Sequence, residues 1–154
     1  MAGFVEELIG RYQKHLERNR TRPFLDSVMA ACALVAIAEG KVTFSHRVHI
    51  DQVIDTLEEL KVFDPHEAVD LFNEYVAAIR KSPSAGRKKA LDSILREVRD
   101  DPEKARLLIR ICLAVSEVNG EIPMADQIEI VALCSRINVD PDEFELYTEN
   151  LPNL

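Results

Sequence analysis

The sequence predicts an all-α protein, a compact bundle of about seven or eight helices, and three observations support this fold class. Apolar residues recur at spacings of three and four along almost the whole chain, which is the period of an amphipathic helix. Glycines and Asp-Pro pairs stand at the ends of these segments. No stretch alternates apolar and polar residues over a useful length. We therefore expect helices joined by short loops, without a β-sheet.

Four helices are predicted in the first half of the chain. The first carries an apolar stripe over residues 4–16. The second follows Thr21-Arg22-Pro23, is apolar nearly all round as a central buried helix should be, and ends at Gly40. The third begins near Ser45. The fourth begins at Asp64-Pro65-His66-Glu67, where Asp can cap, Pro suits the first turn and Glu can close a capping box.

The second half continues with shorter helices. The segment from Ser82 to Gly86 is predicted to interrupt the chain before a fifth helix, and Asp101-Pro102 begins a sixth that Gly120 ends. A seventh follows, and Asp140-Pro141-Asp142-Glu143 starts a short last helix. We expect the tail from Asn150 to Leu154 to fray.

Composition indicates one globular, cytoplasmic domain. The 154 residues are 47% hydrophobic and 30% charged, and neither a signal peptide nor a membrane span is visible. Cys32, Cys112 and Cys134 form no C-x-x-C pair, and each lies in an apolar helical pattern. We interpret them as reduced thiols packed in a core.

The net charge of −8 restricts the ligands that this protein can take. Nucleic acid is a poor partner, because binding it requires Lys and Arg to neutralise phosphates. The negative electrostatic potential that this net charge creates also disfavours binding of oxyanions and favours binding of cations.

Two segments of the chain resemble each other. Residues 36–42 match residues 116–122 around Gly40 and Gly120, and the Asp-Pro-x-Glu caps at Asp64 and Asp140 also match. We interpret this as two helix–loop–helix repeats, one over about 24–67 and one over about 104–147, packed with pseudo-twofold symmetry.

Each repeat loop gathers polar residues around its glycine. The second loop offers oxygens from Glu117, Asn119 and Asp126, and the first offers Glu39 and His46. The spacing equals the second half of an EF-hand loop, in which Gly makes the sharp turn and a carboxylate closes on the ion. Valines stand where the leading Asp of that loop is needed. Two interpretations remain open, a weak or shared divalent-cation site and purely structural turns.

These loops resemble the TerB-like tellurite-resistance family. The resemblance rests on Ala36-Ile37-Ala38-Glu39-Gly40-Lys41-Val42, on Ser116-Glu117-Val118-Asn119-Gly120-Glu121-Ile122 and on Glu59-Leu60-Lys61-Val62-Phe63-Asp64. It covers roughly Phe24 to Phe144. It implies that residues 1–154 form a single TerB-like helical domain, with a bacterial role in tellurite or other metal and chemical stress.

The resemblance also implies a metal site. The family pattern places Asp before each Gly and Glu seven positions after that Asp, and these are the family's proposed ligands. Here the Asp positions hold Glu39 and Asn119, and the Glu positions hold His46 and Asp126. Because Ca²⁺ and Mg²⁺ prefer oxygen ligands, an imidazole either weakens the site or shifts it towards Zn²⁺, Ni²⁺ or Mn²⁺. Glu117, selected by the spacing of the second loop and not by the family pattern, completes the predicted ligand set.

We therefore expect a non-enzymatic stress-response domain that binds a divalent cation, a protein partner, or both, and the partner can be a second copy of the chain. No organic cofactor and no direct binding of the tellurite dianion are expected. The alternative is a metal-free interaction domain, which would show an exposed apolar patch. An enzyme is disfavoured, since the chain lacks H-E-x-x-H, a Gly-rich phosphate loop and a Ser/His/Asp pattern.

Overall fold

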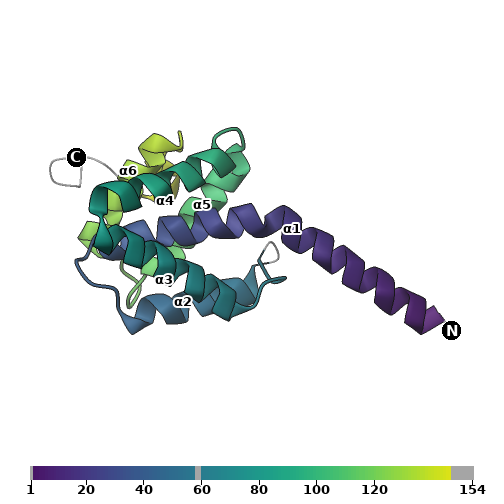
Figure 1. Cartoon of the computed structure of the whole chain (residues 1–154). Helices are drawn as coiled ribbons and strands as arrows, with labels where there is room; N and C mark the ends of the chain where they lie inside the picture. The colour runs from purple at the N-terminus through teal and green to yellow at the C-terminus, as the bar shows by residue number, and fades with distance from the viewer. Residues whose placement is uncertain (1, 58–59, 147–154) are drawn as a thin grey trace.

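A computed structural model describes residues 2–57 and 60–146 of the chain (Figure 1). Within these ranges it forms six α-helices, one 3₁₀ helix and no strand, which confirms the all-α prediction. The tail over 150–154, for which we predict fraying, lies outside the described residues. The helices are α1 (Ala2–Ile37), α2 (Phe44–Thr56), α3 (Pro65–Lys81), α4 (Pro83–Val98), α5 (Pro102–Ser116), α6 (Met124–Arg136) and the 3₁₀ helix η1 (Pro141–Phe144).

The second half of α1 is the central element of the core. From Phe24 to Ala36 every residue except Asp26 is buried, as predicted for a helix that is apolar nearly all round. This segment packs against α3, α4, α5 and α6 (Figure 1). Burying each large apolar side chain in this way stabilises the fold by about 1.5–3 kcal/mol relative to exposure.

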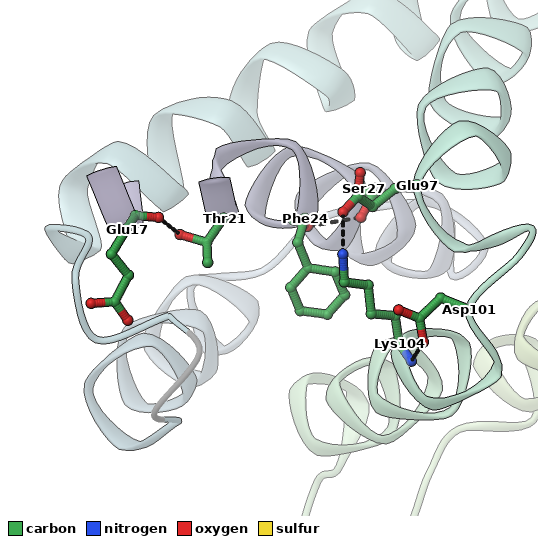
Figure 2. Close-up of polar contacts among 7 residues, drawn as sticks. All are labelled: Glu17, Thr21, Phe24, Ser27, Glu97, Asp101 and Lys104. Atoms are coloured by element: carbon green, nitrogen blue, oxygen red, sulfur yellow. Dashed lines mark hydrogen bonds and ion pairs between the residues drawn. The ribbon is translucent and has the colours of Figure 1, made fainter. Parts of the chain in front are cut away.

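The predicted break at Thr21-Arg22-Pro23 is wrong, because α1 runs through this proline as one helix. Proline removes one backbone donor, but Phe24 and Leu25 enter the core directly after it and fix the direction of the chain. Hydroxyls bond backbone carbonyls on either side of the proline (Figure 2). Thr21 donates to the carbonyl of Glu17 at 2.7 Å, and Ser27 donates to that of Phe24 at 2.8 Å.

The first half of α1 extends away from the bundle into solvent (Figure 1). It is helical, as predicted, and its apolar stripe is exposed: Phe4 is 74% and Tyr12 63% accessible. In the described part of the chain, no helix combines the length and the apolar character that crossing a membrane requires.

The three Asp-Pro signals are confirmed as starts of helices. Asp64 accepts a hydrogen bond from the backbone N–H of His66 at 2.8 Å and begins α3. Asp101 accepts one from Lys104 at 3.1 Å and begins α5 (Figure 2). Asp140 caps η1 in the same way. These carboxylates satisfy backbone donors that a helix leaves free at its first turn.

The predicted interruption occurs at Ser82, between α3 and α4, but Gly86 is not part of it, because it lies inside α4. A Cβ at this position would come within 2.5 Å of the Cα of Ile79 on α3. The glycine therefore allows the backbones of α3 and α4 to approach closely. Its role is packing between two helices and not the formation of a turn.

Candidate metal centre

Glu39, His46 and Asp126 come together from three separate segments. Glu39 lies in the turn after α1, His46 in the first turn of α2 and Asp126 in the first turn of α6. One potential ligand atom from each lies within 4.8 Å of the other two. Both glycines of the loops have positive φ, 91° at Gly40 and 81° at Gly120. The turns that they permit bring the two loops to one place.

Asp126 is the most constrained member of this group. Its side chain is 0% exposed, and neither carboxylate oxygen has a hydrogen-bond partner in the described part of the protein. Burial, followed by the neighbouring Glu39, raises its pKa to about 8, while Ser116 lowers it. A buried carboxylate without partners is costly unless it is neutralised by a proton or a cation.

His46 is also buried, at 5% exposed. Its Nδ1 accepts the backbone N–H of Thr43 at 3.0 Å, while its Nε2 lies 3.9 Å from Oε1 of Glu39. Burial lowers the pKa of His46, and Glu39 opposes this by raising it. The imidazole is therefore neutral at neutral pH. Since Nδ1 accepts a hydrogen bond, the ring hydrogen lies on Nε2 and points towards Glu39.

The structure separates Glu117 from these three residues. Glu117 is exposed at the end of α5 and is not in the group whose ligand atoms lie within 4.8 Å of one another. It lines a groove between α2 and α5 instead. Asn119 stands in the exposed turn beside Gly120, with φ of 53°. Its place in the predicted ligand set stays a prediction.

His49 lies three residues after His46 but has a different role. Its Nδ1 donates to the backbone carbonyl of Val115 at 2.8 Å, which ties α2 to the end of α5. It lines the same groove as Glu117. This bond positions the start of α2, and therefore His46, against the second loop. The sequence does not predict this bond, because a hydrogen bond to a backbone carbonyl has no signature in residue types.

Residues at matching positions of the two predicted repeats are neighbours. Cys32 and Cys112 are 80 positions apart, and the side-chain hydrogen bond that the Cys112 thiol donates to Cys32, together with burial, raises the pKa of Cys112. His46 and Asp126 have the same separation and belong to the same cluster. Pseudo-twofold packing would place such pairs near its axis. The duplication itself stays a prediction.

Comparisons with known proteins identify similar chains. Residues 25–148 match the family described as "Tellurite resistance protein TerB". A protein of Alcaligenes sp. named "Tellurium resistance protein TerB" is 29% identical over 98 residues, which cover 64% of this chain and 80% of that protein. No solved structure matches the chain.

Proposed function

The chain belongs to the TerB family of tellurite-resistance proteins, and on that premise we propose that its two loops bind a divalent cation. The family is not a known enzyme family, and we propose a non-enzymatic role in tellurite or chemical stress. The observation that carries the cation site is the buried carboxylate of Asp126, which has no hydrogen-bond partner in the described structure. Glu39 and His46 face it at distances that suit shared ligation.

The donor set indicates which ions the site prefers. Glu39 and Asp126 supply carboxylate oxygens, and His46 supplies an imidazole nitrogen. Zn²⁺, Ni²⁺ and Mn²⁺ accept such a mixture, whereas Ca²⁺ and Mg²⁺ prefer oxygen ligands alone. A bound cation would supply the positive charge that two adjacent carboxylates lack. It would also link α1, α2 and α6 at their ends.

Ligation by His46 requires a change of tautomer. In the structure Nδ1 accepts from Thr43, so the neutral ring carries its hydrogen on Nε2. If Nε2 is to become a ligand, the hydrogen must move to Nδ1. The hydroxyl of Thr43 lies 3.3 Å from Nδ1 and can accept it there. Cation binding would thus exchange one bond at the start of α2 for another.

The same residues argue against tellurite as the direct ligand. Tellurite is an oxyanion, and the carboxylate of Glu39 would repel it in a protein whose net charge is −8. We therefore propose that the link to tellurite runs through the cation or through a protein partner.

Thermal unfolding of chelator-treated protein tests the proposal. Ca²⁺, Mg²⁺, Mn²⁺, Zn²⁺ and Ni²⁺ are added one at a time to wild type, to Asp126→Asn and to a control, Asp51→Asn, which removes an exposed carboxylate of α2. An ion that binds only the folded state adds about 2.7 kcal/mol at a hundredfold excess over its dissociation constant. We expect a selective rise in Tm in wild type and the control that is absent in Asp126→Asn. No rise with any ion would overturn the proposal.

A protein-interaction domain is the second candidate function. The exposed apolar side chains on the first half of α1 favour this function, because a contiguous exposed apolar surface commonly marks a site of interaction with another molecule.

A further inference from the structure

The first half of α1 is a separate structural element, which we call the N-terminal arm (residues 2–22). Every described side chain from Gly3 to Arg20 is exposed, and burial begins at Phe24. Figure 1 shows this stretch leaving the bundle as a single straight helix. The family match begins at residue 25, so the arm lies outside the part of the chain that defines the family.

The arm carries a continuous apolar stripe. Phe4, Val5, Leu8, Ile9 and Tyr12 are 74%, 55%, 62%, 50% and 63% exposed. Because successive residues of a helix are about 100° apart, these five positions fall on one face. The opposite face holds Gly3 and Gly10, around which a Cβ would meet no atom within 4 Å.

An isolated helix of this kind is not stable by itself in water. In proteins most of the stability of a helix comes from packing of its amphipathic face and not from helix propensity, and Gly3 and Gly10 weaken the propensity of this one further. Packing of the apolar stripe against a partner would supply the stabilisation that the arm lacks. The chemistry of that partner must match both the stripe and the charges beside it.

Charges are unevenly distributed along the arm. Glu6 and Glu7 stand near the end of the arm that is distant from the bundle, where Glu7 pairs with Arg11 at 2.8 Å. Lys14 and Arg20 follow towards the bundle, and Glu17 is the one carboxylate among the basic residues there. Two arms in parallel would place like charges side by side at both ends. Two arms in antiparallel orientation place the acidic end of each beside the basic part of the other. We propose that the arms of two copies of this chain pair in antiparallel orientation through their apolar stripes.

The charge of the bundle favours the same orientation. Residues 2–22 contain five Lys and Arg against three Glu, a net charge of +2, so the rest of the chain carries −8 − 2 = −10. Antiparallel arms of about 30 Å place the two acidic bundles at opposite ends, well beyond the Debye length of about 8 Å at physiological salt. Parallel arms would bring the bundles together. An acidic bundle also repels an anionic membrane surface.

Sedimentation velocity on the full chain tests the proposal over a hundredfold range of concentration. We expect wild type to form dimers, and Leu8→Glu/Ile9→Glu to stay monomeric with an unchanged Tm of the bundle. Phe44→Glu is the matched control, since Phe44 is 77% exposed on α2, and it should dimerise as wild type does. A monomeric wild type, or a dimer that survives Leu8→Glu/Ile9→Glu, would overturn the proposal.

Charge reversal tests the orientation. Glu6→Lys/Glu7→Lys makes the arm uniformly basic, and Arg11→Glu/Lys14→Glu makes its first two thirds acidic. We expect the dissociation constant of the dimer to rise at least tenfold for each variant alone. A mixture of the two variants should regain dimerisation. A parallel pair would keep its affinity in Glu6→Lys/Glu7→Lys, because like charges face each other before and after the change. Monomeric wild type that binds vesicles of phosphatidylglycerol would identify a membrane surface as the partner instead.

Discussion

The backbone N–H of Thr43 donates to Nδ1 of His46 at 3.0 Å. One imidazole therefore satisfies a free donor at the start of α2 and also presents its Nε2 to Glu39, 3.9 Å away. The stability of the helix start and the proposed cation site share this side chain. Variants at His46 can separate the two roles, because the amide of glutamine can accept the N–H of Thr43 at the helix start but does not replace the imidazole as a cation ligand.

Replacing His46 by glutamine should preserve the fold and remove the cation response. A glutamine at the third position of a helix can accept the N–H of the capping residue, as in a capping box. We expect metal-free His46→Gln to unfold at nearly the wild-type denaturant concentration and His46→Ala to lose about 1 kcal/mol.

The two variants should lose the stabilisation by added cation equally. Chemical denaturation with and without the stabilising ion measures both effects. A full cation response in His46→Gln would exclude the imidazole from the ligand set.

Asp126→Asn should stabilise the metal-free protein, and more strongly as the pH rises. The pKa of Asp126 is about 8 in the folded protein, against an ordinary value of 3.8. Between these values the folded state keeps a proton that the unfolded state releases. The contribution of Asp126 to the free energy of unfolding is therefore fully present below about pH 4 and is lost as the pH rises through about 8.

Asparagine is neutral throughout, so the gain should be small below about pH 4 and should grow to several kcal/mol at pH 8, since one unit of pKa shift corresponds to about 1.4 kcal/mol. Urea unfolding across this range, after treatment with chelator, measures the difference. The exposed control Asp51→Asn should run parallel to wild type. A gain of Asp126→Asn that does not change with pH would contradict the buried, protonated carboxyl.

Local signals in the sequence predicted most of the fold. The helical period and the caps at Asp64, Asp101 and Asp140 depend on neighbours within one turn, and the structure confirms them. Pro23 and Gly86 were misread because their roles depend on distant parts of the chain. Packing of the core continues α1 through Pro23, and the approach of α3 requires Gly86.

The candidate site was predictable in part. The spacing around the two glycines and the family pattern selected Glu39, His46 and Asp126, which the structure brings together. Spacing alone also selected Glu117, but it cannot show the direction of a side chain at the residue where a helix ends. The bond from Thr43 to His46 was missed, because histidine is not a residue expected to cap a helix.

Gly86→Ala should destabilise the bundle through a steric clash. The new Cβ would lie 2.5 Å from the Cα of Ile79 and 2.6 Å from the carbonyl group of Ala78, and backbone atoms cannot yield as a flexible side chain can. Helices α3 and α4 must separate, at a cost of about 1–3 kcal/mol. Gly10→Ala is the control, since nothing lies near that position. Equal stability of Gly86→Ala and wild type in urea would contradict the close approach of the two helices.

Tyr75→Phe should weaken a contact that joins three helices. The hydroxyl of Tyr75 on α3 donates to Oδ2 of Asp26 on α1 at 2.6 Å, and the hydroxyl of Ser93 on α4 donates to the same oxygen at 2.6 Å. Hydrogen bonds to a charged group contribute about 1.5–3 kcal/mol. We expect a loss of this size at pH 7, measured by urea unfolding. Tyr12→Phe, which changes an exposed tyrosine, should have no effect.

The same variant should change how stability depends on alkaline pH. Burial and the bond to Asp26 raise the pKa of Tyr75 from 10.0 to about 12. The folded state therefore keeps the phenolic proton between pH 10 and 12, where the unfolded state releases it. This contribution to stability is complete below pH 10 and is lost as the pH rises through 12. Because phenylalanine has no such proton, the difference between wild type and Tyr75→Phe should shrink over this interval. A difference that stays constant from pH 9 to pH 12 would show that the hydroxyl of Tyr75 does not donate to Asp26 in solution.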